Sequence, residues 1–133
     1  MAEGKIVFQG KTNTGKDLII RYPLMSDVFK MRDFMNTVSK EQTFIRFQGE
    51  QLSLEDEEKY LRGQLEGIKN KRGVKLIAFI EDKFIGVSDI NMLWGVEEHI
   101  GVFGIIVADG YRGEGIGKLL MENVINEAIK EIP

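Results

Sequence analysis

Apolar and polar residues follow one another along this chain with two different spacings, one typical of β-strands and the other typical of α-helices. Two short apolar segments of strand length come first, at 5–9 and 17–22. The residues between them include Asn13-Thr14-Gly15, a combination typical of a tight turn. The start of the sequence therefore predicts a β-hairpin.

Helical spacing follows in two segments. The first helix is expected to begin at a cap, Ser26 or Asp27, and to reach about Ser39. The second is expected to run from Ser53 to about Asn70, with acidic residues in its first turn. The residues that give each helix an apolar face are Val28, Met31, Met35 and Val38, and then Leu54, Leu61, Leu65 and Ile68.

The last part of the chain returns to strand spacing and ends in a helix. Strands are expected at 74–81 and 84–91, separated by the tight-turn residues Asp82-Lys83, and again at 99–107. The final segment, 115–131, is apolar on more than half of a helix circumference, which predicts a helix packed against a sheet. The order β-β-α-α-β-β-β-α predicts an α/β (α+β) fold with a mostly antiparallel mixed sheet flanked by helices.

Composition limits the class of protein further. The 133 residues are the length of one domain, and a net charge of −3 gives no general affinity for nucleic acid. The absence of cysteine excludes disulfides and thiolate nucleophiles, and a single histidine excludes a histidine-rich metal site, so no metal is expected. No signal-peptide-like start or bilayer-length apolar run is present, which predicts a cytoplasmic protein without a membrane partner.

The most informative chemistry lies where the third strand of this part meets the final helix, within residues 105–120. Gly113, Gly115 and Gly117 fall in the connecting loop, and glycine lets backbone N–H groups approach a ligand because no Cβ intervenes. A helix N-terminus carries about half a positive charge and unpaired donors. Arg112 adds a cation suited to phosphate oxygens. Together these features predict an anion site, most often one for phosphate.

Two other phosphate-binding motifs fit less well. The dinucleotide fingerprint requires Gly-x-Gly-x-x-Gly, and Lys118 occupies the position of its third glycine. Residues 10–16 have the spacing of a P-loop, but Asp17 replaces the Ser or Thr that would ligate magnesium. The residues after Asp17 are also typical of a strand rather than of the helix that a P-loop opens, so this match is interpreted as accidental.

The sequence of the glycine loop is similar to a known signature. Arg112-x-x-Gly115-x-Gly117, after an apolar strand and before an apolar-rich helix, resembles the acetyl-CoA signature of the GNAT family of N-acetyltransferases. Two further stretches, 41–47 followed by Leu52-Ser53 and 99–105, resemble segments of uncharacterised members of that family. The resemblance implies the acyl-CoA N-acyltransferase-like fold and a single N-acetyltransferase-like domain over residues 1–133.

The resemblance also implies which residues hold acetyl-CoA, the cosubstrate. In the family the last residues of the strand bind the pantetheine arm through their backbone groups, and the loop amides hold the pyrophosphate. By position, the strand residues are Ile105, Ile106 and Val107, and the loop residues are Arg112, Gly113, Glu114, Gly115, Ile116, Gly117 and Lys118. Asp109 stands where the family often has proline, a departure that touches only the turn.

The activity that the resemblance implies is direct transfer of an acetyl group from acetyl-CoA to a primary amine in a ternary complex. A base must remove a proton from that amine. Family members often use a glutamate on the strand before the loop, at a position that Val102 occupies here. Glu98 and His99, with Glu97 beside them, are candidates to replace it, and Asp89 on the neighbouring strand is a further one.

The sequence stops where the family fold continues with another strand, a fourth helix and a final hairpin. We therefore expect the N-terminal and cofactor-binding part of that fold, or a homodimer in which another copy pairs with the free sheet edge. A non-catalytic acyl-CoA-binding or regulatory module is the alternative function, and a nucleotide-binding α/β domain is a third. The basic cluster 69–72 either balances a helix C-terminus or contacts the 3′-phosphate of CoA.

Overall fold

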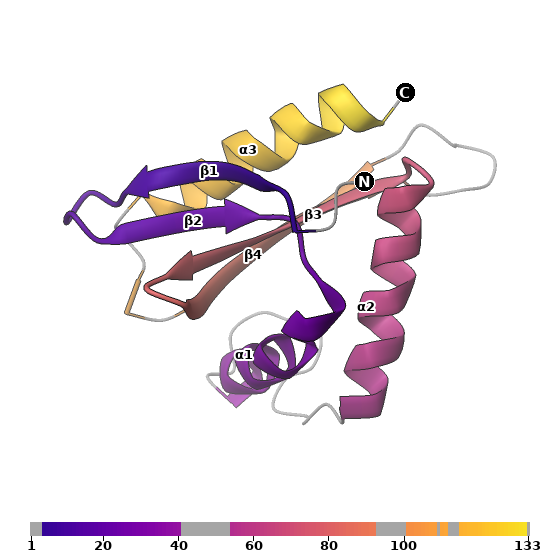
Figure 1. Cartoon of the computed structure of the whole chain (residues 1–133), viewed down its shortest axis with the longest axis horizontal. Helices are drawn as coiled ribbons and strands as arrows, with labels where there is room; N and C mark the ends of the chain where they lie inside the picture. The colour runs from indigo at the N-terminus through magenta and orange to yellow at the C-terminus, as the bar shows by residue number, and fades with distance from the viewer. Residues whose placement is uncertain (1–3, 41–53, 93–100, 109, 112–114, 133) are drawn as a thin grey trace.

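The computed structural model describes residues 4–40, 54–92, 101–108, 110–111 and 115–132. Its elements, in chain order, are β1 (Ile6–Lys11), β2 (Asp17–Arg21), the 3-10 turn η1 (Met25–Asp27), α1 (Val28–Lys40), α2 (Leu54–Lys69), β3 (Gly73–Ile80), β4 (Lys83–Met92), β5 (Gly101–Val107) and α3 (Ile116–Glu131) (Figure 1). The order of strands and helices is the predicted one, with η1 added. No helix in the described ranges is both long and apolar enough to cross a bilayer.

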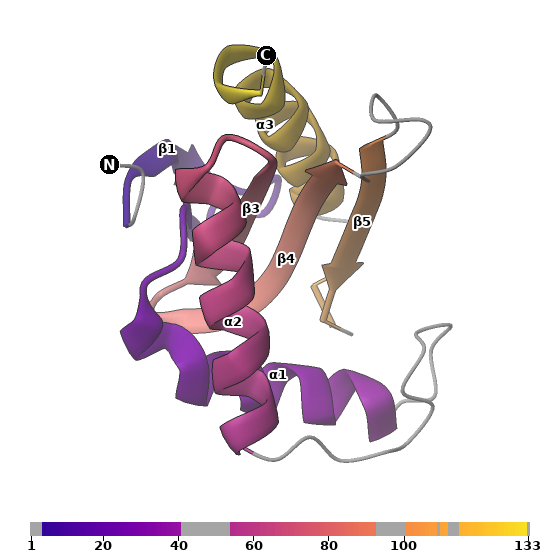
Figure 2. The same ribbon diagram turned by 90° about the vertical axis from the view of Figure 1, so that its right-hand side faces the viewer.

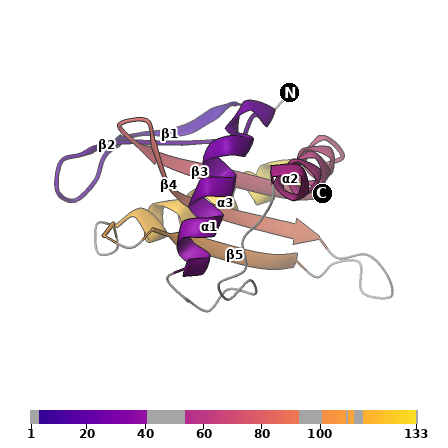
Figure 3. The same cartoon turned by 90° about the horizontal axis from the view of Figure 1, so that it is seen from below.

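The strands form one sheet in the order β1-β2-β3-β4-β5, and every neighbouring pair is antiparallel. α3 covers one face of this sheet, whereas α1 and α2 lie on the opposite face (Figures 1 and 3). Among the described residues, β1 and β5 are the two edges of the sheet. The architecture confirms the predicted fold class of an antiparallel sheet flanked by helices.

An apolar cluster fills each face of the sheet. β3 is buried along its whole length because helices cover both of its faces. On the α3 side, the alternate residues of β3 pack with Ile116, Leu120 and Val124. On the other side, Ile77 and Phe79 pack with residues of α1 and α2. Because Ile116 is only 1% exposed, the first turn of α3 is fixed on the sheet, and the loop that precedes it has a rigid anchor.

The start of the first helix differs from the prediction. We expected Ser26 or Asp27 to cap a helix, but helical structure begins earlier, as η1 at Met25. The Asp27 carboxylate accepts a hydrogen bond from the Leu24 N–H at 2.6 Å, so it acts on the residue before the turn. The α-helix α1 itself begins at Val28, directly after Asp27, as predicted, but the Asp27 carboxylate acts on Leu24 and also binds Arg21 of β2.

The hairpin between β3 and β4 is confirmed, but its turn lies one residue earlier than predicted. Ile80 and Lys83 are paired, which leaves Glu81 and Asp82 as the turn residues. Both have positive φ values, 50° and 71°, as a two-residue hairpin turn of this type requires. Aspartate tolerates this conformation better than most residues, so Asp82 was recognised as a turn residue and Glu81 was not.

A buried polar contact joins the second strand to the end of α3. The Tyr22 hydroxyl donates to Glu127 Oε1 at 2.9 Å, and the two residues are 1% and 5% exposed. Lys5 Nζ lies 3.9 Å from Oε1 and Lys130 Nζ lies 3.5 Å from Oε2, so the carboxylate has cations at both oxygens. Burial, followed by the hydrogen bond to Glu127, raises the pKa of Tyr22 above its usual value of 10.0.

The free energy of unfolding is expected to fall at alkaline pH through Tyr22. Its raised pKa keeps the folded-state phenol protonated while the unfolded-state phenol ionises, so this contribution is complete below pH 10 and is lost as the pH rises further. Relative to Tyr22→Phe, wild type should lose up to about 1.4 kcal/mol per pH unit above that value. Urea unfolding of both proteins at neutral and alkaline pH measures the difference. Parallel pH profiles would show that Tyr22 is not responsible.

Candidate functional site

The strand β5 offers one side of its backbone to a ligand. Its residues pair with β4, with Val107 opposite Gly86, Ile106 opposite Val87 and Ile105 opposite Ser88. Within the described chain no strand lies on its other side. The side chains alternate between the two faces: Ile105 and Val107 pack into the cluster under α3, and Ile106 packs into the cluster under α1 and α2. Outward backbone N–H and C=O groups of this edge are therefore placed to bind an extended molecule.

Gly115 closes the loop and caps α3 in a left-handed conformation, with a φ of 83°. Its carbonyl accepts the first helical hydrogen bond, from the Leu119 N–H at 3.1 Å. A Cβ at this position would lie 3.0 Å from Asn13 Nδ2, because Asn13, in the turn of the β1–β2 hairpin, lies beside Gly115. Both the φ value and this contact favour glycine. The N–H groups of the next residues, at the start of α3, have no partner within the helix because of helix geometry.

The protein side of Gly117 has room for a side chain. A Cβ there would point toward β5, 4.0 Å from Ile105 Cδ1 and from Val107 Cγ2. This distance is an ordinary contact, so the described structure gives no steric reason for glycine on the protein side. The contact does show that the first turn of α3 and the end of β5 lie side by side.

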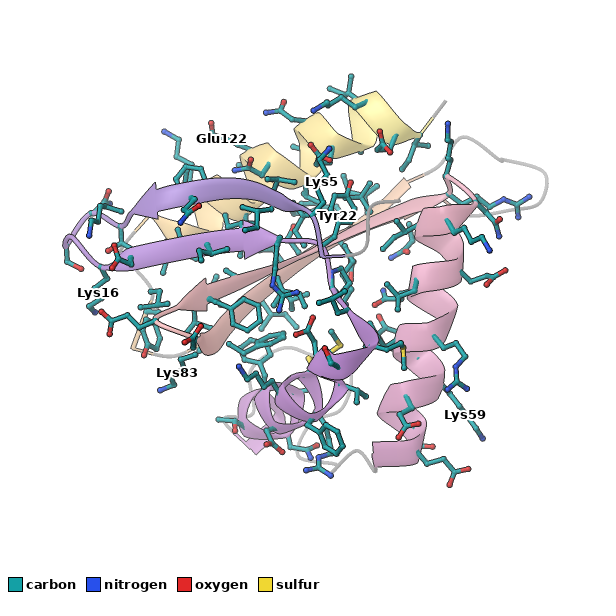
Figure 4. All side chains as sticks on the ribbon, viewed as in Figure 1. Lys5, Lys16, Tyr22, Lys59, Lys83 and Glu122 are labelled. Carbon is teal, nitrogen blue, oxygen red and sulfur yellow. The ribbon has the colours of Figure 1, made fainter. Side chains whose placement is uncertain are left out.

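Cations gather at the end of the molecule where this loop lies. The Nζ atoms of Lys16 and Lys83 each lie 5.4 Å from the centre of the Tyr111 ring; Lys16 comes from the turn of the β1–β2 hairpin and Lys83 from the start of β4. Figure 4 shows both lysines at the same end of the molecule. Lys118, in the first turn of α3, is exposed. Together with the α3 N-terminus, these ammonium groups make this end favourable for an anion.

The structure brings the described members of the predicted cofactor site together. Ile105, Ile106 and Val107 end β5, and Gly115, Ile116, Gly117 and Lys118 begin α3 directly beside it. The other predicted residues lie outside the described residues: Arg112, Gly113 and Glu114 of the loop, and the proposed bases Glu98 and His99 with Glu97. Their assignments stay predictions.

Asp89, the further candidate base, lies in a polar cluster on the face covered by α1 and α2. Its Oδ2 atom is 3.5 Å from Lys75 Nζ of β3 and accepts a hydrogen bond from Gln64 Nε2 of α2 at 3.4 Å. Sequence reasoning missed both partners. A lysine inside the otherwise apolar strand 73–80 was the available signal, because a buried cation requires a carboxylate nearby.

A cleft of about 570 Å³ lies at the other end of α3, away from the glycine loop. Its lining includes Tyr22, Glu127 and Glu131, together with Lys69 and Lys71 from the basic cluster. Along α3, Glu131 is about 22 Å from Ile116, at about 1.5 Å per residue. Lys69 lies in the last turn of α2. This placement favours the interpretation that the basic cluster balances a helix C-terminus.

Comparison with known proteins identifies the class. The model of the acetyltransferase (GNAT) family matches residues 34–132, and the chain belongs to this family. Among solved structures, it is similar to a GNAT-family acetyltransferase from Streptococcus pneumoniae, with 28% identity, a TM-score of 0.74, and coverage of 86% of this chain and 70% of that one. The search of curated proteins found no match.

Two more distant structures share the fold. The GNAT domain of S. lividans PAT is 21% identical, with a TM-score of 0.74, and the match covers 94% of this chain and 73% of that one. The acetyltransferase yncA from Salmonella typhimurium, solved with its cofactor acetyl-CoA, is 13% identical, with a TM-score of 0.70. That match covers 85% of this chain and 64% of yncA. The chain thus spans between about two thirds and three quarters of the length of the proteins that it matches.

Proposed function

We propose that this protein is an acetyl-CoA-dependent N-acetyltransferase that transfers the acetyl group to a primary amine by direct attack in a ternary complex. The observation that carries this proposal is the junction of β5 with α3. There Gly115 adopts its left-handed conformation beneath Asn13 and opens a helix N-terminus beside a free strand edge. Membership of the GNAT family and the acetyl-CoA bound to yncA support the choice of cofactor.

The two parts of the junction suit the two parts of acetyl-CoA. The free backbone edge at Ile105, Ile106 and Val107 would hydrogen-bond the amides of the pantetheine arm, as a neighbouring strand would. The loop from Arg112 to Lys118 would hold the pyrophosphate with backbone N–H groups and the α3 N-terminus. Lys16 and Lys83, which flank Tyr111, add positive charge at the same end.

The transfer itself needs three events. The acceptor ammonium group loses a proton to a base, for which Glu98 and His99 are the predicted groups. The neutral nitrogen then attacks the thioester carbonyl carbon, forming a C–N bond, and the C–S bond breaks. CoA leaves as a thiolate and takes up a proton. No acetyl-cysteine intermediate forms, because the sequence has no cysteine.

The chain is expected to bind acetyl-CoA with a dissociation constant in the micromolar range, measured by calorimetric titration. ATP should bind at least about tenfold more weakly, because it lacks the pantetheine arm that the β5 edge would hold; tenfold corresponds to about 1.4 kcal/mol. Equal affinity for ATP and CoA would favour a nucleotide-binding domain. The mass in solution, recorded beside the titration, tests the proposed homodimer through β5.

A non-catalytic acyl-CoA-binding module is the second candidate. It is favoured by Val102, a residue of β5 that has no proton-transferring group where related proteins often have a glutamate. Release of free thiol from acetyl-CoA, measured with and without a panel of primary amines, separates the two candidates. Amine-dependent thiol release supports the enzyme, and tight CoA binding without any release supports the module.

A further inference from the structure

Three adjacent strands place three residues in one row across the sheet. Lys75 of β3 is opposite Asp89 of β4, and Asp89 is opposite Gly104 of β5. All three positions belong to the face that α1 and α2 cover, since the alternate positions Val74 and Leu76 face α3. In Figure 2, β4 and β5 lie side by side. α3 lies on one face of these strands, and α1 and α2 lie on the opposite face.

The carboxylate of Asp89 is held in a fixed place over β5. Lys75 is 4% exposed and pairs with Oδ2, while Gln64 donates to the same oxygen. A Cβ at Gly104 would lie 3.1 Å from Asp89 Oδ1, so the missing side chain of Gly104 is what lets the carboxylate lie against the β5 backbone. The Asp89 side chain is 20% exposed, whereas that of Lys75 is 5% exposed. Of the two charged groups, the carboxylate is the accessible one.

The reacting thioester of acetyl-CoA would lie beside Gly104 of β5. A pantetheine arm that leaves the loop before α3 and follows the β5 edge runs from Val107 toward Gly104, about 10 Å at about 3.3 Å per residue. The α3 side of this strand is filled, because Ile105 and Val107 pack into the cluster under α3. At Gly104 the opposite face carries no β5 side chain, and the Asp89 side chain there is partly exposed, so we expect the acceptor to approach from that face.

We propose that Asp89, in place of Glu98 or His99, binds the ammonium group of the primary-amine acceptor and receives its proton. The inference rests on the proposed function, because it places the thioester beside Gly104. The ammonium donates a hydrogen bond to the carboxylate and passes one proton to it, directly or through one water. The neutral nitrogen forms the C–N bond as the C–S bond breaks. The proton that the nitrogen loses next protonates the CoA thiolate, and Asp89 returns its own proton to solvent.

Lys75 and Gln64 act as positioning residues in this arrangement. Both contact Oδ2, and in the described part of the chain Oδ1, the oxygen beside Gly104, is placed to receive the ammonium group. Tyr60 of α2 belongs to the same polar cluster, because its hydroxyl accepts a hydrogen bond from Gln64 Nε2 at 3.1 Å. Tyr60 is exposed, and Lys75 Nζ lies 5.4 Å from the centre of its ring, so the ring lies close to the Lys75–Asp89 pair.

The test uses n-butylammonium as the amine and n-butanol as its uncharged counterpart, each titrated into the isotopically labelled, CoA-loaded chain. NMR should show saturable shifts of the Asp89 carboxyl carbon and the Gly104 amide with n-butylammonium only. Because Asp89→Asn alone leaves Lys75 buried without its carboxylate, the informative variant is Asp89→Asn with Lys75→Met. It should lose the saturable response.

Asp33→Asn is the matched control, because it removes the same charge from an exposed carboxylate on α1 that pairs with the adjacent Arg32. It should leave the n-butylammonium response unchanged. CoA binding is measured first on every protein: failure of wild type to bind CoA overturns the proposed function. Normal CoA binding with no saturable response in wild type, or with the same response in the double variant, overturns the Asp89 site alone. A response to n-butanol equal to that of the amine also overturns it.

Discussion

Replacing Gly115 with aspartate is expected to weaken CoA binding by at least about 100-fold, or about 2.7 kcal/mol. The new carboxylate would stand at the N-terminus of α3, where the pyrophosphate is proposed to bind, and two anions would compete for the same N–H groups. The side chain would also meet Asn13, whose Nδ2 atom lies 3.0 Å from the required Cβ position. Calorimetric titration with CoA measures the effect.

Gly115→Asn separates charge from shape in this experiment. Asparagine has the size of aspartate and tolerates the left-handed conformation equally well, but it carries no charge. It should reproduce only the part of the loss that comes from contact with Asn13. Circular dichroism and urea unfolding of both variants show whether α3 remains folded on Leu120 and Val124. Wild-type CoA affinity in a folded Gly115→Asp protein would remove the loop from the cofactor site.

The sequence was sufficient to predict the fold because its local and long-range signals agree. Apolar runs such as 74–81 give strands, and helical spacing around Leu61 and Leu120 gives helices, so each element was found near its observed bounds. One error occurred where a single residue serves two elements. Aspartate is typical of helix caps, but the carboxylate of Asp27 binds Arg21 of β2. Local spacing carries no information about such a partner.

The candidate site was predictable only in its continuous part. The end of β5 and the start of α3 are one stretch of sequence, so their proximity follows from the strand-loop-helix pattern. Other contacts join parts of the chain that are distant in the sequence: Asn13 lies beside Gly115, and Lys16 and Lys83 lie beside the Tyr111 ring. These contacts depend on strand register, which spacing alone leaves open.

The same dependence on register explains why Asp89 was undervalued. Its position in 84–91 predicted a strand residue on one face, but not that Lys75 and Gly104 would lie directly opposite. A buried lysine in β3 is costly without a partner, so Asp89 has a structural reason to be present as well as the proposed chemical one. The variant that removes both charges is designed to separate these two roles.

The Arg21–Asp27 pair joins the sheet to the helices on its second face. Arg21 Nη1 and Nη2 donate to Asp27 Oδ2 and Oδ1 at 2.8 and 2.7 Å, and the guanidinium carbon lies 4.6 Å from the centre of the Phe79 ring. Asp27 is 5% exposed, so water replaces little of this interaction when the carboxylate is lost. The Leu24 N–H, which donates to the same carboxylate, would lose its acceptor too.

Asp27→Ala is therefore expected to lower the free energy of unfolding by about 3–5 kcal/mol, because it leaves Arg21 charged and partly buried without its carboxylate. Asp17→Ala, which breaks the exposed ion pair with Lys11, should cost no more than about 1 kcal/mol. Urea unfolding at neutral pH compares the two. Replacing both partners, Arg21→Met with Asp27→Leu, should recover much of the loss, since no uncompensated charge remains. If the single and double variants were equally destabilised, the loss would come from packing around η1 rather than from the unpaired cation, and the first helix would owe its position to apolar contacts with Phe79 and its neighbours.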